Sequence, residues 1–400
     1  MRLLYIGATW PQPWVTAAGV RTIGLINAFK SFGYNVKFLS IKKENPSQIK
    51  GIEEVGVERH FCAANDEETF KSLTNEEDIC VFETARVEEM FGHMVYQFLP
   101  ACKRVIDTQD LHFLRLAREK MINDKSIEQI KNIEINWKEE DVTREISAML
   151  RSHSTILTSE FEQRLIQKHF PFIKTVCLPF FYSDQEINEN SRKNCHLRYR
   201  DNFVWIGNFT HPPNVDAVNY MVEKIWPAIR TALGCELHIY GAHCPNSEAW
   251  RSNGVVVKGP MKSLETLKKY RVLLAPIRYG AGIKGKITDS FLYGLPVLTT
   301  SIGAEGIDPF PGVIANSTES LIDAAISMYD NTILLQNCQL KGFSILKEKF
   351  SNSKNSYLLQ NHIRGLEDKP LHSVMFSETM RSTFYFSKYL QAKNSKTNSK

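Results

Sequence analysis

Glycines and lysines are concentrated in one loop of the second half of the chain. Residues 280–285 read GAGIKG, and Lys286 follows directly. The loop comes after an apolar run, 272–277, that is typical of a buried strand, and before a run that is typical of a short helix. Glycines let backbone N–H groups approach a ligand closely, and the start of a helix favours negative charge. Together with the ammonium groups of Lys284 and Lys286, the loop is a candidate binding site for a diphosphate.

The same loop has the spacing GxGxxG, which dinucleotide-binding domains use at a strand–helix turn. Glu305 follows about 20 residues further on, where such domains place an acid that binds a ribose. The motif lies late in the chain, however, rather than at the first turn of a doubly wound sheet, and that fold does not require the two lysines. We therefore favour the diphosphate interpretation and keep the dinucleotide site as an alternative.

A second set of polar residues follows predicted strands in the first half of the chain. Asp110 and His112 come just after the strand predicted at 105–108, so their side chains should reach the edge of a sheet where ligands bind. Gly19 and Arg21 lie near the start of the first predicted helix. Gly19 permits close backbone approach, and Arg21 is either a phosphate ligand or a solvent-facing side chain.

The elements that must position these residues alternate between strand-like and helix-like runs. This alternation is typical of parallel sheets that are covered on both faces by helices. In the first half, strands are predicted at residues 3–7, 36–40, 79–83, 105–108 and 155–159. Helices are predicted at 19–32, at 87–98 and, as one long charged helix, at 127–150.

The length of the chain and a polar stretch in its middle predict two domains. A chain of 400 residues is too long for one ordinary core. The predicted division is a first domain at 1–180, a linker at 181–200, a second domain at 201–331, terminal helices at 332–367 and a tail at 368–400. The tail ends in AKNSKTNSK, a polar and lysine-rich sequence that predicts disorder.

Composition narrows the class of protein. Hydrophobic residues make up 43% of the chain and charged residues 23%, as in soluble globular proteins. The net charge of +5 suits an anionic ligand but is too small for a concentrated nucleic-acid-binding face, so no nucleic-acid partner is expected. The eight cysteines form no CxxC pair, which predicts reduced thiols and a cytoplasmic location. No signal peptide or apolar run of ~20 residues is evident, so membrane contact is expected to be peripheral at most.

Several segments in order along the chain carry a family resemblance. They are residues 203–230 (FVWIGNFTHPPNVDAVNYMVEKIWPAIR), 237–241 (LHIYG), 254–261 (GVVVKGPM) and 275–306 (APIRYGAGIKGKITDSFLYGLPVLTTSIGAEG). They resemble the nucleotide-sugar-binding half of GT-B glycosyltransferases of the retaining group 1 type. The N-terminal half is similar more loosely, through RLLYIGATWPQPWVTAAGVRTIGL and RVIDTQDLHFLR. The resemblance implies an α/β GT-B fold with two Rossmann-like domains facing across a cleft, and terminal helices that cross back to the first domain.

The resemblance also implies roles for residues of the second domain. Lys286, helped by Lys284, would bind the donor diphosphate. Asp289 stands at the second position of the family's E-x7-E pair, which is associated with the donor ribose, whereas Ala281 replaces the first acid. Further candidates for donor binding are Gly207, Asn208, Gly282, Ile283 and Gly285.

In the first domain, the resemblance places the reacting sugar near the segment after the strand at 105–108. Many relatives have His-Asp there, but this chain has Gln109 followed by Asp110. His112, two residues further, is the candidate replacement for the family histidine. Asp110, His112 and Lys286 are therefore the catalytic candidates, and Gly19 and Arg21 would contact the donor or acceptor.

The expected activity is transfer of a sugar from a nucleoside-diphosphate sugar with retention of configuration. Lysines and a helix start would stabilise the leaving diphosphate, so no metal or other cofactor is expected. The acceptor could be a glycan, a lipid-linked molecule, a protein or a small molecule. Two alternatives stay open at this point. One is a nucleotide-sugar epimerase or hydrolase on the same fold, and the other is a non-catalytic sugar-nucleotide-binding protein.

Overall fold

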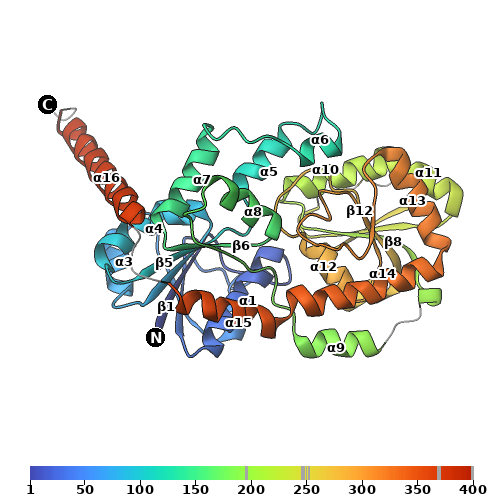
Figure 1. Cartoon of the computed structure of the whole chain (residues 1–400), viewed down its shortest axis with the longest axis horizontal. Helices are drawn as coiled ribbons and strands as arrows, with labels where there is room; N and C mark the ends of the chain where they lie inside the picture. The colour runs from blue at the N-terminus through green and yellow to red at the C-terminus, as the bar shows by residue number, and fades with distance from the viewer. Residues whose placement is uncertain (194–196, 245–247, 249, 251–252, 367–370, 398–400) are drawn as a thin grey trace.

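The chain folds into two α/β units, each built on one parallel sheet (Figure 1). The computed structural model describes all residues except 194–196, 245–247, 249, 251–252, 367–370 and 398–400. The prediction of two Rossmann-like domains with parallel sheets is confirmed. The first sheet has the order β3-β2-β1-β4-β5-β6-β7. Its strands are β1 (Arg2–Gly7), β2 (Asn35–Ser40), β3 (Glu58–Phe61), β4 (Ile79–Glu83), β5 (Lys103–Asp107), β6 (Ser154–Leu157) and β7 (Thr175–Cys177).

Helices cover both faces of the first sheet, so its central strands are buried on both sides. β1 illustrates this, because Leu3 and Tyr5 pack into one core cluster whereas Leu4 and Ile6 pack into another. The α-helices of this half of the chain are α1 (Ala17–Ser31), α2 (Lys50–Val55), α3 (Glu67–Leu73), α4 (Ala85–Phe98), α5 (His112–Glu119), α6 (Ile127–Lys131), α7 (Glu140–Arg151) and α8 (Glu160–His169).

The second sheet has the order β10-β9-β8-β11-β12-β13. Its strands are β8 (Asp201–Ile206), β9 (Leu237–Tyr240), β10 (Val255–Gly259), β11 (Tyr270–Ala275), β12 (Val297–Thr299) and β13 (Val313–Ile314). The α-helices of this domain are α10 (Pro212–Tyr220), α11 (Trp226–Leu233), α12 (Gly285–Leu292), α13 (Thr318–Asp330) and α14 (Thr332–Ile345). Short 3-10 or π segments are η1 (Leu197–Tyr199), η2 (Met221–Ile225), η3 (Leu264–Lys269) and η4 (Leu346–Phe350).

The chain crosses between the domains twice, and the two crossings lie side by side. The N–H of Tyr182 donates to the carbonyl of Phe350 (2.9 Å), and the N–H of Asn352 donates to the carbonyl of Tyr182 (2.8 Å). After the second crossing, α15 (Asn352–Arg364) packs on α1 and adds Leu359 and Ile363 to a core cluster of the first domain. The stretch predicted as a linker contains α9 (Asp184–Arg192), which Ser183 caps and whose Ile187 is buried.

The prediction of one long helix at 127–150 is wrong. The structure has two helices, α6 and α7, separated by residues 132–139. Ser126 begins α6 with a capping box. Ile127 and Ile130 of α6 pack into the core cluster of the second domain, whereas Ile146 of α7 packs within the first domain. The apolar residues of the two halves face different cores, so a single straight helix could not bury both sets.

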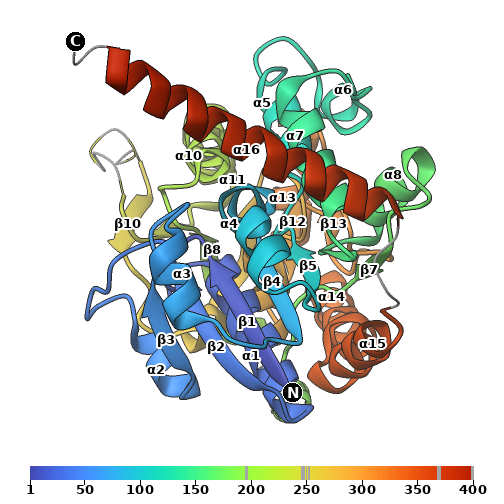
Figure 2. The ribbon, with the colours of Figure 1, turned by 90° about the vertical axis from the view of Figure 1, so that its left-hand side faces the viewer.

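Of the tail predicted to be disordered, 368–400, residues 371–397 are described and are helical, and the remainder lies outside the described residues. Residues Leu371–Thr397 form α16, which crosses over α4 and α7 (Figure 2) and extends beyond the body of the first domain (Figure 1). Its attachment is polar. The guanidinium of buried Arg104 donates to Ser377 (2.7 Å) and Ser373 (3.1 Å), and Ser373 donates to the carbonyl of Arg151 (2.7 Å). A buried arginine requires such partners, and composition alone does not reveal them.

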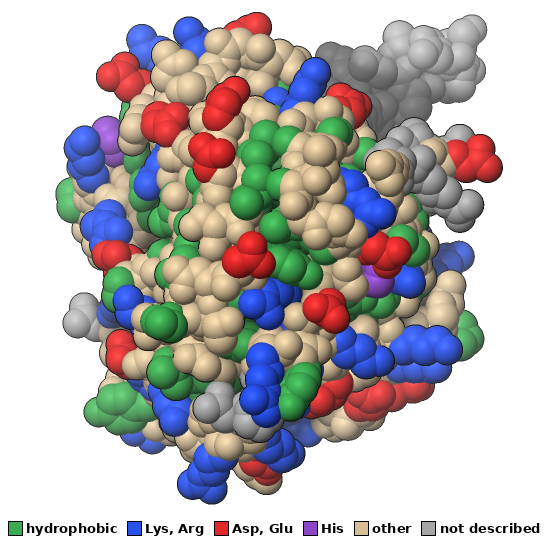
Figure 3. Space-filling view, turned by 90° about the vertical axis from the view of Figure 1, so that its right-hand side faces the viewer, with side chains coloured by type: hydrophobic (Ala, Val, Ile, Leu, Met, Phe, Trp, Pro, Cys, Tyr) green, Lys and Arg blue, Asp and Glu red, His purple; other side chains and the backbone are tan. Residues whose placement is uncertain are grey.

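The outer face of the second domain carries both signs of charge. Figure 3 shows lysine and arginine side chains interspersed with acidic ones, with apolar side chains between them. None of the described helices has an apolar stretch long enough to cross a membrane.

One buried ion pair joins the domains. Arg118, on the last turn of α5, contacts both carboxylate oxygens of Glu305 (2.7 and 2.8 Å) and is fully buried. It also donates to the carbonyl of Gly280 (2.7 Å) and to that of Lys131 (3.2 Å). The first domain is thus tied to the segment after β12 and to the glycine-rich loop after β11.

We predict that Glu305→Ala lowers the free energy of unfolding by about 3–5 kcal/mol, because it leaves the guanidinium of Arg118 buried without its counterion. The exposed pair Lys120–Glu139 provides the control, since Glu139→Ala should change stability by at most about 1 kcal/mol. Urea unfolding followed by circular dichroism measures both variants. Equal losses in the two variants would contradict the prediction.

Candidate functional site

The candidate site lies where the strand ends of the two sheets face each other. The loop after β5 contains Asp110, and the loop after β11 contains Gly282. A Cβ atom added to Gly282 would lie 3.1 Å from the Cβ of Asp110, and one added to Gly285 would lie 2.7 Å from the Cβ of Ala17. These two glycines therefore allow the glycine-rich loop to rest directly on loops of the first domain. The positive φ of Gly282 (62°) is a second reason for glycine at that position.

Asp110 organises the polar groups on the first-domain side. Its two carboxylate oxygens contact Nε2 of His112 (3.1 Å) and Nε of Arg115 (2.8 Å). His112 is the first residue of α5, whose N-terminal N–H groups at His112 and Phe113 donate to Glu145 on α7 (3.2 and 2.9 Å). The two candidates Asp110 and His112 are thus in contact with each other. Arg115 and Glu145, which the sequence analysis did not identify, belong to the same polar group.

This arrangement shifts the pKa values of the group. Burial alone would raise the pKa of Asp110, but the hydrogen bond from His112 and the charges of His112 and Arg115 hold it well below its usual range. Burial lowers the pKa of His112, and the hydrogen bond and charge of Asp110 raise it more, so the net shift is upward. Burial raises the pKa of Glu145 to about 7.

His211 connects this group electrostatically to the second domain. It is the N-cap residue of α10. Its side chain is exposed, and the charges of Asp110, Arg115 and Lys286 act on it. His211 is therefore close enough to charged candidates of both domains to interact with them electrostatically.

Gln109, at the position of the family histidine, faces the interior of the first domain. Its φ is positive (62°), and its side-chain amide donates to Asp107 (3.0 Å) and Thr22 (3.2 Å). A non-glycine residue with this φ is uncommon and needs such support. Gln109 therefore anchors the loop that presents Asp110.

Neither proposed role of Arg21, phosphate ligand or solvent-facing side chain, fits the structure. Arg21 is 2% exposed and forms an ion pair with Asp107 (2.7 Å). It also donates to the carbonyls of Leu178 and Pro179. Its donors are occupied within the first domain, so the sequence-based assignment of Arg21 to donor or acceptor binding is corrected to a structural role.

The candidate role of Gly19 has a similar structural explanation. Its N–H donates to the hydroxyl of Thr16 (3.0 Å), which caps α1. A Cβ atom at this position would lie 2.6 Å from the backbone of Gln12. Close packing of the loop before α1 therefore requires the glycine, and its N–H is not directed at the cleft.

The two lysines of the glycine-rich loop occupy different environments. Lys284 is the N-cap of α12, and its ammonium donates to the carbonyl of Gly282 (2.9 Å). Burial lowers its pKa to about 8, although the charge of Glu305 partly offsets this. Lys286 donates to the side chain of Asn214 (2.5 Å), and burial lowers its pKa to about 7. Both ammonium groups lie near the start of α12.

The remaining donor candidates are distributed around this helix. Asp289 accepts a hydrogen bond from the hydroxyl of Tyr182 (2.6 Å), and burial raises its pKa to about 6. The side chain of Ile283 packs against the core of the second domain, so only its backbone is placed for a ligand. A Cβ at Gly207 would lie 3.1 Å from Nζ of Lys286. The side-chain oxygen of Asn208 accepts the N–H of Thr210 (3.0 Å), which shapes its own loop.

Sequence reasoning missed Arg118, Tyr182, Trp205 and Asn214 in addition to Arg115. Arg115 lies one turn after Asp110–His112 on a predictable helix, so its helical spacing was an available signal. Asn214 follows two prolines that start α10, a position from which a side chain can reach the preceding loop. Arg118 and Tyr182 act across the domain boundary, and no local pattern identifies such partners.

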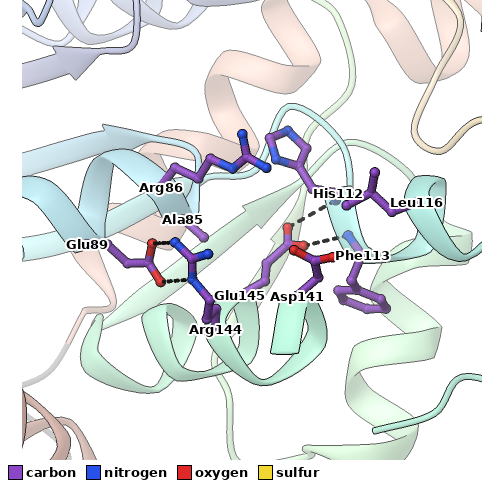
Figure 4. Close-up of a pocket in the computed structure, with 9 residues that line it drawn as sticks. All are labelled: Ala85, Arg86, Glu89, His112, Phe113, Leu116, Asp141, Arg144 and Glu145. Atoms are coloured by element: carbon purple, nitrogen blue, oxygen red, sulfur yellow. Dashed lines mark hydrogen bonds and ion pairs between the residues drawn. The ribbon is translucent and has the colours of Figure 1, made fainter. Parts of the chain in front are cut away.

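A surface pocket lies beside His112 on the first-domain side (Figure 4). In Figure 4, Arg86 and His112 point toward each other across its upper edge, and Asp141 and Glu145 lie together below them. Arg144 forms a two-pronged ion pair with Glu89 at one side. The lining consists of Ala85, Arg86, Glu89, His112, Phe113, Leu116, Asp141, Arg144 and Glu145. The lining thus combines charged side chains with the apolar ones of Ala85, Phe113 and Leu116.

Known proteins resemble the chain at two levels. Residues 200–331 match the model of the family described as glycosyl transferases group 1. Over the whole chain, the fold is similar to Anabaena HepE in complex with UDP and glucose (TM-score 0.66, 11% identity, covering 92% of this chain and 100% of that chain). No curated protein matches the sequence.

Two further structures have a similar fold over nearly the whole chain. Sucrose-phosphate synthase from Thermosynechococcus elongatus has a TM-score of 0.65 at 13% identity and covers 92% of this chain and 99% of its own. TarM from S. aureus, in complex with UDP and other ligands, has a TM-score of 0.65 at 9% identity and covers 91% and 100%. The second domain thus matches the model of the glycosyl transferases group 1 family, and the chain as a whole has the GT-B fold of these structures.

Proposed function

We propose that the protein transfers a sugar from a nucleoside-diphosphate sugar, held mainly by the second domain, to an acceptor held against the first domain. The observation that carries this proposal is the meeting of Asp110 and His112 with the loop of Lys284 and Lys286, where Gly282 touches Asp110. The presence of UDP in the similar structures of HepE and TarM supports a uridine nucleotide as the first donor to test.

The second domain would stabilise the leaving diphosphate. Negative charge on the diphosphate grows as the bond to the sugar breaks, so positive groups at that point bind the transition state more tightly than the substrate. Lys286, Lys284 and the start of α12 supply this charge without a metal ion. Asp289, half-buried on the next turn of α12, would accept hydrogen bonds from a ribose, and the backbone at Gly207 and Asn208 would contribute to donor binding beside Lys286.

The first domain would supply the reacting groups and the acceptor site. Asp110 stays ionised because its pKa is low, so it can stabilise positive charge on the sugar ring in the transition state. His112, bonded to Asp110, borders the pocket of Figure 4, which is the candidate acceptor site for a glycan, a lipid-linked molecule, a protein or a small molecule. Retention of configuration, by attack from the face that the leaving group departs from, is part of the proposal.

A nucleotide screen followed by calorimetry tests the donor site. Thermal-shift measurements with UDP-, GDP-, ADP- and dTDP-sugars identify the base, since a ligand at 100 times its Kd adds ~2.7 kcal/mol of stability. For the nucleotide that binds, Lys286→Ala should weaken affinity roughly ten- to a hundredfold, because a hydrogen bond from a charged group contributes about 1.5–3 kcal/mol. Turnover should fall further, and Lys286→Arg should restore only part of the affinity.

The exposed Lys262 of the same domain provides the control, and Lys262→Ala should bind the nucleotide as the wild type does. Unchanged affinity in Lys286→Ala for every nucleotide that the wild type binds would place the donor site elsewhere.

We expect His112→Ala to lower turnover roughly 10- to 100-fold while leaving nucleotide affinity nearly unchanged, since His112 lies on the acceptor side of the interface. Steady-state kinetics and calorimetry measure the two quantities. His60→Ala, which changes a histidine on β3 of the same domain, is the matched control and should keep full turnover. A parallel loss of affinity and turnover in His112→Ala would contradict the assignment.

The Asp110–His112 pair predicts a pH-dependent stability. The folded pKa of His112 lies above its ordinary value of about 6.5, so the pair stabilises the fold fully below that pH and loses this contribution as the pH rises through the folded pKa. Asp110→Asn should therefore cost more stability near pH 6 than near pH 9, as measured by urea unfolding. Asp141→Asn, an exposed acid of the same pocket, should cost the same at both. A pH-independent cost for Asp110→Asn would refute this.

A further inference from the structure

The ammonium group of Lys286 is held by neutral groups. Its Nζ donates to Oδ1 of Asn214 (2.5 Å) and lies 3.8 Å from the centre of the Trp205 ring. No carboxylate of the described residues forms an ion pair with it. Most partly buried lysines are paired with an acid, because a buried charge is otherwise unfavourable. The surroundings of Lys286 therefore fix its position without neutralising its charge.

Asn214 is itself fixed in orientation. It is 9% exposed on the first turn of α10, and its Nδ2 donates to the carbonyl of Asn208 (2.7 Å). Since the amide nitrogen is engaged by a carbonyl acceptor, the amide oxygen must be the atom that faces Lys286. Asn214 thus ties the loop after β8 to the first turn of α12.

The neighbouring residues leave room for this contact. A Cβ atom at Gly207 would lie 2.9 Å from the side chain of Asn214 and 3.1 Å from Nζ of Lys286, so any other residue there would displace these two side chains. Trp205 is fully buried, and its indole N–H has no hydrogen-bond partner among the described residues. Trp205 therefore meets Lys286 through the face of its ring, which attracts a cation without carrying a charge.

We propose that Asn214 is the positioning residue of Lys286, holding the ammonium group over Trp205 with its charge uncompensated so that it is available to the donor diphosphate. This inference rests on the proposed role of Lys286 in donor binding. A carboxylate at position 214 would hold the lysine equally well but would neutralise it, and an apolar side chain would leave it free to move. The neutral amide of Asn214 can orient Lys286 without neutralising the charge of its ammonium group.

The electrostatics of the pocket agree with this assignment. Burial lowers the pKa of Lys286 to about 7, and no charged group of the described residues offsets the shift. His211, at the start of α10, is a titratable group that interacts with the charge of Lys286. A bound diphosphate would raise the pKa of Lys286, so the protein should take up a proton with the nucleotide, and affinity should fall as the pH rises above about 7.

Two variants of Asn214 separate positioning from simple structural support. In nucleotide-free protein, Asn214→Asp should raise the pKa of Lys286 by about one unit or more, as measured by NMR of ¹³C-labelled lysine. Its UDP affinity should fall about tenfold near neutral pH, and the decrease in affinity above pH 7 should largely disappear. Asn214→Ala should weaken UDP binding while keeping the wild-type form of the pH dependence.

The control is Asn219→Asp, which adds the same charge to the same helix at an exposed position that contacts Trp250 rather than Lys286. It should leave the pKa of Lys286 and the UDP affinity unchanged. Failure of the wild type to bind UDP or any other nucleotide would overturn the donor role, whereas the NMR measurement would still test the contact. If Asn214→Asp folds and leaves both the pKa of Lys286 and the affinity at wild-type values, the positioning role is wrong.

Discussion

The buried ion pair between Arg118 and Glu305 is the interaction on which the relation of the two domains depends. It joins α5, whose first residue is His112, to the segment after β12, and the same guanidinium holds the carbonyl of Gly280. A charge pair of this kind is favourable only when its geometry is complete, because both ions have lost their water. Because Arg118 contacts both Glu305 and Gly280, the same side chain holds the two domains together and fixes the backbone at the start of the glycine-rich loop.

A second buried network places the catalytic candidates of the first domain. Arg21, Asp107 and Gln109 form it at the end of β5, and Glu83 joins it with a pKa that burial raises to about 7. Gln109 adopts an uncommon backbone conformation that this network stabilises. The loop then turns so that Asp110 faces the second domain. Gln109 thus stabilises this loop through its hydrogen bonds to Thr22 and Asp107. Asp110 and His112 form a polar contact beside the second domain.

The second domain offers the complementary arrangement, with positive charge held in place by neutral partners. Lys284 and Lys286 lie at the start of one short helix, and a side chain at Gly282 or Gly285 would create contacts of less than about 3 Å with the first domain. The glycine-rich motif therefore has two physical roles. It exposes backbone N–H groups to a ligand, and it lets the first domain approach closely enough to complete the site.

Local sequence determined the alternation of strands and helices and the parallel class of both sheets, because these features depend on periodicity. It also determined which segments carry the site candidates, because glycine placement and strand ends mark them. These candidates are Asp110, His112, Lys284, Lys286 and Asp289. Only the tertiary structure decided which polar residues face one another. Arg21 is buried because it forms an ion pair with the buried Asp107. The segment 127–150 forms two helices, because its apolar residues pack into two different cores. The contact of α16 with the first domain includes hydrogen bonds from the buried Arg104. Asn214, Arg118 and Tyr182 act on residues that are far away in sequence. Burial and long-range pairing set these contacts, and neither can be read from the composition or spacing of a single segment.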